Sequence, residues 1–181
     1  PIDDYLESDE FPEWSYDSMP ESLWNLHHWG DVGYGVLNDA DGQVLYYRRD
    51  VLNDPRWQEE FKAATGHDMV VPPKTWQQLL EISQFFAGKN WDDNDADPDH
   101  GTVLHLKVGE QGHYHFQSLS SSFAITPGDK VDQYHNVYWF DPTDMTPLIN
   151  SPGHVKALEF LQELHKTGPA AQVGWSLGEA W

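Results

Sequence analysis

The pattern of apolar and polar residues predicts a first helical segment over residues 50–65, which Pro55 breaks early. Trp57, Phe61 and Ala64 recur there at the i, i+4, i+7 spacing that places side chains on one helical face. Gly66 follows as a typical helix terminator. We expect this face to pack into the core.

A second helix is predicted to begin after Thr75. The Thr75 side chain can cap the first turn while Gln78 reaches back, the reciprocal arrangement called a capping box. Leu79, Ile82 and Phe86 then supply an apolar face, and a glycine two residues later ends the helix.

A third helix is predicted to open with Ser151 as its cap and Pro152 as its first residue. Its buried face is expected to carry Ala157, Leu158, Leu161 and Leu164. A Gly-Pro pair closes it. Residues 112–125 have moderate helical character, and another helix is predicted to begin near Ser176.

Three segments are predicted to be strands because they are rich in aromatic and β-branched residues, namely residues 44–48, 102–108 and 134–140. Strands that alternate with capped helices are typical of layered α/β architectures. We therefore predict an α/β fold in which helices flank a sheet.

Composition narrows the range of functions. Acidic residues outnumber basic ones 30 to 10, giving a net charge of −20, and such a surface repels phosphate backbones, which excludes nucleic acid as a partner. Aromatic residues make up 14% of the chain, so it can bury a core despite its charge. It has no cysteine, and no apolar run approaches the roughly 20 residues that a membrane helix needs.

The first residues carry no secretory leader pattern. The chain begins with Pro1 and continues with acidic residues, without a basic region followed by an apolar one. We interpret it as a processed form or a fragment.

Residues 35–50, GVLNDADGQVLYYRRD, are the strongest candidate for a ligand-contacting segment. A loop of small and acidic residues runs there directly into a predicted strand, which can hold carboxylates rigidly at the edge of a sheet. Asn38, Asp39 and Asp41 are the candidate contacts. The alternative is an Asx-rich turn that contacts no ligand.

Short motifs in this chain resemble those of a known family. They are IDDY at 2–5, YYRRD at 46–50, PPKTWQQLL at 72–80, and NSP at 150–152 followed by ALEFL at 157–161. Their order and spread are similar to those in the extracellular solute-binding proteins of ABC importers, in the carbohydrate-type group that includes maltose-binding protein. Each motif alone is weak, but the ordered set is fairly specific.

The resemblance implies one lobe of a two-lobed periplasmic-binding-protein fold, incomplete at both ends. Residues 1–42 would be the end of the first lobe with the crossover segment, and residues 43–181 the second-lobe α/β domain. An exposed face where the other lobe belongs would favour self-association of this chain.

The resemblance also implies a role. It suggests a periplasmic or extracellular receptor, not an enzyme, that captures a sugar or polyol between its lobes. The receptor would need no cofactor and would deliver the solute to the ABC permease subunits in the membrane.

Site residues follow from the same resemblance. Its register places Asp41 at the position of a sugar-binding carboxylate, with Asn38 and Asp39 nearby. It places residues 112–117 where the family's cleft helix presents an aromatic ring. The candidates in that segment are Tyr114, Phe116 and Gln117.

Alternatives remain open. A carbohydrate-active enzyme or a carbohydrate-binding accessory domain is the rival function, with Asp39 and Asp41 as paired carboxylates, although glycosidase pairs normally come from separate elements. The acidic run at 92–99 invites a calcium interpretation, but it lacks the glycine and glutamate that an EF-hand loop requires. His113 and His115 could bind zinc only with a third ligand that the sequence does not identify.

Overall fold

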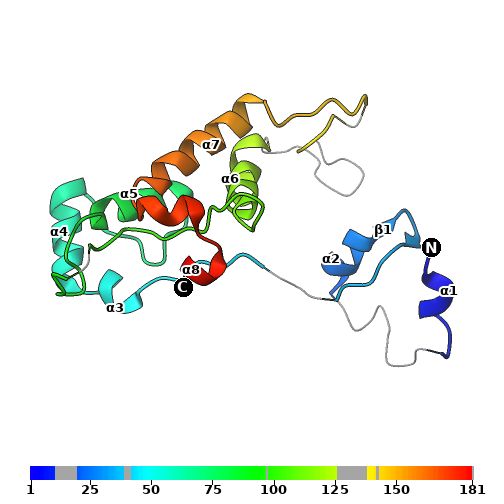
Figure 1. The fold of residues 1–181 in the computed structure, drawn as a ribbon, viewed down its shortest axis with the longest axis horizontal. Coiled ribbons are helices and arrows are strands. Elements are labelled where there is room, and N and C mark those ends of the chain that lie inside the picture. Colours follow the sequence, from blue (N-terminus) through cyan, green and yellow to red (C-terminus); the bar gives the residue numbers. More distant parts are fainter. Residues whose placement is uncertain (11–19, 39–41, 97, 126–137, 142, 181) are drawn as a thin grey trace.

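The computed structural model describes residues 1–10, 20–38, 42–96, 98–125, 138–141 and 143–180. Figure 1 shows the described elements in two groups, the short elements before residue 37 on one side and the longer helices on the other. The first group consists of α1 (Asp3–Leu6), α2 (Glu21–Trp24), the 3-10 helix η2 (Asn25–His27), β1 (His28–Trp29) and β2 (Val32–Gly33). The second consists of α3 (Arg49–Leu52), α4 (Pro55–Thr65), α5 (Trp76–Phe86), α6 (His113–Ala124), α7 (Pro152–His165), η3 (Ala170–Gly174) and α8 (Leu177–Ala180).

The first group is organised by a tight hairpin. Strands β1 and β2 pair antiparallel, with His28 opposite Gly33, and Gly30 takes the positive φ of +63° at the turn. The backbone N–H of Gly33 donates to both carboxylate oxygens of Asp3, at 3.1 and 2.9 Å. The IDDY motif therefore attaches α1 to the hairpin.

Helix α4 confirms the prediction of a helix before Gly66. Pro55 is its first residue, and Gly66 adopts the left-handed φ of +85° that ends it. Trp57 and Phe61 are buried, as expected, whereas Ala64 is exposed, so the packed face is narrower than predicted.

Helix α5 begins where the capping motif places it. The Thr75 Oγ1 accepts from the backbone N–H of Gln78 at 3.2 Å. The side chain of Gln78 reaches back as predicted, but it accepts from the N–H of Lys74, at 2.7 Å, one residue earlier than a standard capping box.

Helix α7 also begins at the predicted proline and buries Ala157, Leu161 and Leu164. The expected burial of Leu158 is wrong, because this side chain is 49% exposed. One residue along a helix is a rotation of about 100°, which carries Leu158 off the face that Ala157 occupies. His154 fills the buried position in the first turn instead.

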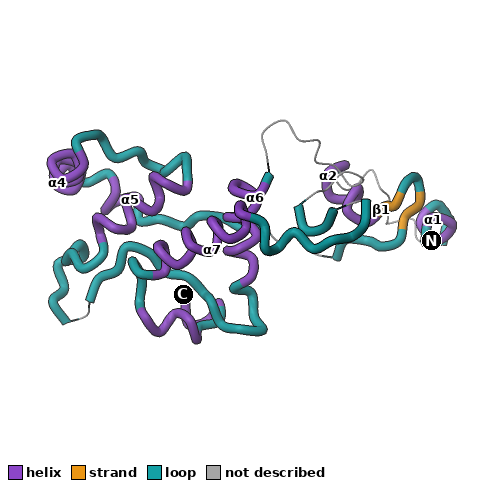
Figure 2. The backbone as a smooth tube through the Cα atoms, turned by 90° about the horizontal axis from the view of Figure 1, so that it is seen from above, coloured by secondary structure: helices purple, strands orange, loops and turns teal. Residues whose placement is uncertain are grey.

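Two adjoining apolar clusters form the core. One lies among α3, α4 and α5 and contains Val51, Leu52, Trp57, Phe61, Met69, Ile82 and Phe86. The other joins α5, α6 and α7 and contains Leu80, Leu104, Leu119, Ala157, Leu161 and Leu164. Helix α5 contributes to both, and Figure 2 shows it beside the pair formed by α6 and α7.

The predicted strand at residues 102–108 is wrong, because its hydrogen-bonding partner is not a strand. The N–H of Leu106 donates to the carbonyl of Gln172 at 3.1 Å, and that of Lys107 donates to Trp175 at 3.1 Å. Gln172 belongs to the 3-10 helix η3, whose carbonyls do not follow the repeat of a β-ladder. The segment is therefore extended but irregular.

The predicted strand at 44–48 is also wrong, and the one at 134–140 is tested only over its last three residues. Residues 44–48 are exposed and irregular, and no described strand lies beside them to complete a ladder. Residues 134–137 lie outside the described part of the chain, and Phe140 makes only an isolated bridge with Pro147. The described residues thus form a mainly helical arrangement with one two-stranded sheet, and not the predicted sheet flanked by helices.

Candidate functional site

The acidic loop of the 35–50 stretch is described only in part. Asn38 is exposed, whereas Asp39 and Asp41 lie outside the described residues, so their contact with a ligand stays a prediction. Gln43 follows this loop, and its side-chain carbonyl accepts a hydrogen bond from the Ser118 hydroxyl of α6. The stretch therefore lies against the helix that carries the other candidate residues.

The end of the same stretch is held by an arginine–carboxylate pair. Arg48 donates from Nε to Oδ1 of Asp50 at 2.9 Å and from Nη2 to Oδ2 at 2.6 Å. This hydrogen bonding lowers the pKa of Asp50 to about 2. The Arg48 guanidinium also lies 5.2 Å from the centre of the Trp91 ring. Arg48 therefore has a structural role, fixing the chain at the start of α3.

A wide hollow of about 770 Å³ opens next to this pair. Its lining residues are Tyr47, Arg49, Asp50, Asn53, Val71 and Pro72. None of them is a predicted ligand contact. The hollow combines an aromatic ring, a cation and an amide, but the Asn53 amide already donates to the Arg49 carbonyl at 2.7 Å.

The candidate residues on α6 point in different directions. Tyr114 is 44% exposed, whereas Phe116 is half-buried and packs against the α6–α7 core. The ring of Phe116 lies 6.3 Å from that of Trp139. Gln117 is also half-buried, and its backbone carbonyl accepts from the Tyr138 hydroxyl at 2.9 Å. Of the three candidates, Tyr114 is therefore the most accessible to a solute.

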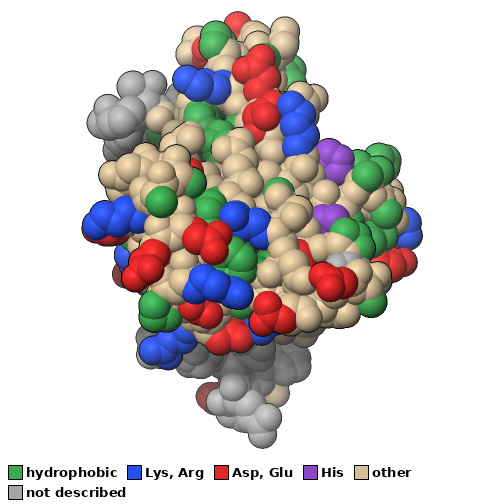
Figure 3. Space-filling view, turned by 90° about the vertical axis from the view of Figure 1, so that its left-hand side faces the viewer, with side chains coloured by type: hydrophobic (Ala, Val, Ile, Leu, Met, Phe, Trp, Pro, Cys, Tyr) green, Lys and Arg blue, Asp and Glu red, His purple; other side chains and the backbone are tan. Residues whose placement is uncertain are grey.

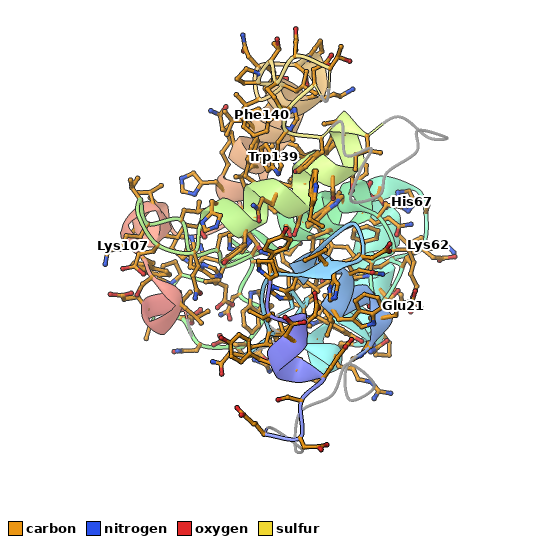
Figure 4. All side chains as sticks on the ribbon, turned by 90° about the vertical axis from the view of Figure 1, so that its right-hand side faces the viewer. Glu21, Lys62, His67, Lys107, Trp139 and Phe140 are labelled. Carbon is orange, nitrogen blue, oxygen red and sulfur yellow. The ribbon has the colours of Figure 1, made fainter. Side chains whose placement is uncertain are left out.

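His154 of α7 packs in an aromatic cluster beside Phe116 of α6, a feature that the sequence did not reveal. His154 is 1% exposed, and its ring lies 5.2 Å from that of Tyr138 and 5.3 Å from that of Trp139. Its Nδ1 lies 2.9 Å from the Ser151 hydroxyl. Burial lowers the pKa of His154, which favours the neutral ring. Figure 4 labels Trp139 beside these helices, next to the exposed Phe140.

His105, in the extended segment before α6, packs against His115 in the first turn of α6. The ring centres of His105 and His115 are 4.3 Å apart. Within the described chain, His105 Nδ1 and His115 Nε2 are buried without a hydrogen-bond partner. Burial, followed by the charge of His105, lowers the pKa of His115 to about 4. The described residues contain no cluster of three or more His, Cys, Asp or Glu side chains suited to a metal ion.

Two carboxylates of the acidic run at 92–99 accept hydrogen bonds from nearby backbone N–H groups. Asp99 Oδ2 accepts from the N–H of Trp91 at 2.6 Å, and Asp92 Oδ1 accepts from the N–H of Asn94 at 2.9 Å. Asp97 lies outside the described residues. This is the side-chain-to-backbone bonding of an Asx-rich loop.

Most described cations are paired with acids. Figure 3 shows Lys and Arg side chains beside Asp and Glu across one face. The ion pairs are Arg48–Asp50, Arg56–Asp93, Lys62–Asp68, Lys89–Glu60, Lys107–Glu110 and Lys166–Glu163. Among the described residues, these pairs leave few basic groups to neutralise an anionic ligand.

No helix in the described part of the chain is long and apolar enough to cross a membrane.

Curated relatives of this chain are bacterial binding proteins. The sn-glycerol-3-phosphate-binding periplasmic protein of Shigella flexneri is 28% identical over 136 residues, which cover 75% of this chain and 25% of the relative. The proteins of the same name from Salmonella typhimurium and Escherichia coli K12 are each 28% identical over 131 residues, covering 72% of this chain and 24% of theirs. The chain thus spans about a quarter of the length of these relatives.

No solved structure matches this chain significantly. A family model does match, over residues 1–181, and its description is "Bacterial extracellular solute-binding protein". On this match across the whole chain, the protein belongs to the bacterial extracellular solute-binding protein family.

Proposed function

We propose that this chain is part of the substrate-binding component of an ABC importer. The component captures a carbohydrate-like solute in a cleft between two lobes and delivers it to permease subunits in the membrane. The observation that carries the proposal is the family match over residues 1–181. The relatives are named for sn-glycerol-3-phosphate, a phosphorylated polyol, which agrees with a solute rich in hydroxyl groups.

Family membership supports two broader points. A periplasmic or extracellular location follows from the family and from the periplasmic relatives. The family and these relatives are binding proteins rather than enzymes. For this chain we likewise propose that it captures a solute without converting it chemically.

The division of the chain is also proposed. Residues 1–42 would end the first lobe and form the crossover, and residues 43–181 would belong to the second lobe. The separation of the two groups of elements in Figure 1 supports a boundary in this region.

The proposed ligand contacts come from both sides of that boundary. The loop supplies Asn38, Asp39 and Asp41, and α6 supplies Tyr114, Phe116 and Gln117. The hydrogen bond between Gln43 and Ser118 supports this grouping, because it holds the end of the loop against α6. Small-molecule sites usually combine a few well-placed polar groups with an aromatic ring.

Calorimetry on the full-length protein with a panel of sugars and polyols tests this function. Asp41→Ala should weaken binding of the best solute by about tenfold or more, because a charged hydrogen bond contributes roughly 1.5–3 kcal/mol. Asp95→Ala, which removes an exposed carboxylate from the 92–99 loop, should leave the affinity unchanged. An affinity within about twofold of wild type would remove Asp41 from the site, and product formation by the purified protein would contradict the receptor function.

A further inference from the structure

Helix α6 differs from the other long helices in its charge. Its sequence, HYHFQSLSSSFA, contains no Asp, Glu, Lys or Arg, although 22% of the chain is charged. Helices α4, α5 and α7 each carry at least one such residue. A helix face that only meets water normally carries charged side chains. The exposed face of α6 therefore resembles a contact surface more than a solvated one.

That face is lined with hydroxyl groups. Tyr114, Ser118 and Ser121 follow the i, i+4, i+7 spacing of one helical face, here called the hydroxyl stripe. Leu119 and Ser120 are buried on the other side of the helix. Tyr114 and Ser121 are exposed, and Ser118 is half-buried beneath Gln43. The stripe offers an aromatic ring and uncharged polar groups together.

Gln43 completes this surface from a distant part of the chain. Its side-chain carbonyl accepts from Ser118, which lies 75 residues away in sequence. Gln43 is exposed, and its amide nitrogen donates to no described residue, so it can still donate to another molecule. Ser118 can likewise exchange its present acceptor for a solute hydroxyl, because a hydroxyl both donates and accepts.

We propose that Ser118 and Gln43 form a hydroxyl-recognising pair that selects an uncharged part of the solute beside Tyr114. This proposal rests on the proposed function and adds two specificity-determining residues to it. In the absence of solute the Ser118 hydroxyl donates to the Gln43 side-chain carbonyl. Solute hydroxyls replace that bond, and a phosphate group is disfavoured because the hydroxyl stripe contains no cation to balance it.

Titration calorimetry of the full-length protein tests the pair. The probes are maltose, trehalose, glycerol and sn-glycerol-3-phosphate. An uncharged probe should bind more tightly than sn-glycerol-3-phosphate. Ser118→Ala and Gln43→Ala should each weaken that binding about fivefold, the usual effect of one uncharged hydrogen bond, with a less than multiplicative loss in the double variant.

Ser22→Ala is the matched control, because Ser22 is an exposed helical serine on α2, away from α6. It should keep the wild-type affinity. If the pair were only structural, the single variants would lower the melting temperature while the affinity stayed within twofold, and the proposal would be wrong. Tight binding of sn-glycerol-3-phosphate alone would also overturn it, with the receptor function intact. No binding of any probe would count against both.

Discussion

At the scale of single residues, the clearest constraints come from glycines where two segments touch. A Cβ on Gly101 would lie 1.7 Å from the carbonyl oxygen of Ser83 in α5. A Cβ on Gly168 would lie 2.6 Å from both Gln172 Nε2 and the Thr102 carbonyl oxygen. These glycines let the 102–108 segment lie directly between α5 and the end of α7.

Gly101→Ala should therefore destabilise the fold. The added methyl group meets backbone and not a movable side chain, so we expect a loss of about 2–3 kcal/mol in the free energy of unfolding, or more. Urea unfolding followed by circular dichroism measures it. Gly178→Ala, where no atom lies within 4 Å of the added Cβ, is the control and should be close to neutral. Equal midpoints for the two variants would contradict the packing argument.

The histidine pair predicts a dependence of stability on pH. His115 has a folded pKa of about 4, below its ordinary value of 6.5, because burial disfavours the charged ring. Its contribution to stability is therefore complete above about pH 6.5 and is lost as the pH falls from there toward 4, where the unfolded state binds the extra proton. Thermal melts of wild type and His115→Gln across this range should show a smaller loss in the variant.

His67 provides a control with the opposite sign. Hydrogen bonds to the Asp68 carbonyl and to Glu81 raise its pKa, so its contribution is present below its unfolded pKa and is lost as the pH rises through the folded pKa. His67→Gln should leave the acid-side loss in place. An unchanged acid limb in His115→Gln would show that another group causes it.

At the scale of elements, helix starts that depend on neighbouring residues were predicted correctly, whereas strands that depend on a distant partner were not. The start of α5 could be predicted because Thr75 and Gln78 act within one turn, and the same holds for Pro152 at the start of α7. The strand predictions at 44–48 and 102–108 failed because a strand depends on a partner elsewhere in the chain. Residues 102–108 found the 3-10 helix η3 instead of a strand. Sequence alone could not reveal that partner.

Thr75→Ala tests the best local prediction. Loss of the side-chain oxygen leaves the N–H of Gln78 without its cap, and we expect a loss of about 1 kcal/mol in the free energy of unfolding. Thr75→Ser keeps the hydroxyl and should restore most of that loss. Chemical denaturation of the three proteins distinguishes the cap from the lost methyl group, since equal stability of the Ala and Ser variants would rule the cap out.

At the scale of the whole molecule, the candidate site could be predicted only in outline. Sequence motifs pointed to residues 112–117, but Tyr114 and Phe116 could not be told apart because their exposure depends on how α6 packs against α7. The hydrogen bond between Gln43 and Ser118 and the burial of His154 are tertiary features without a local signal. The carboxylates of Asp39 and Asp41 stay a prediction.

The segment directly after Gln43 exposes a run of apolar side chains. Val44, Leu45, Tyr46 and Tyr47 are each at least 40% exposed. Clustered apolar side chains favour association, whereas a net charge of −20 opposes it. The expected self-association of this chain stays a prediction, and it should strengthen with added salt because salt screens the repulsion.

The absence of charge on the hydroxyl stripe has a consequence for the speed of capture. A strongly negative protein slows the diffusional approach of anions and speeds that of cations, and both effects fade as ionic strength rises. An uncharged solute experiences no such field. Under the proposal that such a solute is captured at α6, its encounter would be governed by diffusion and shape, and the rate of capture would keep the same pace when the salinity changes.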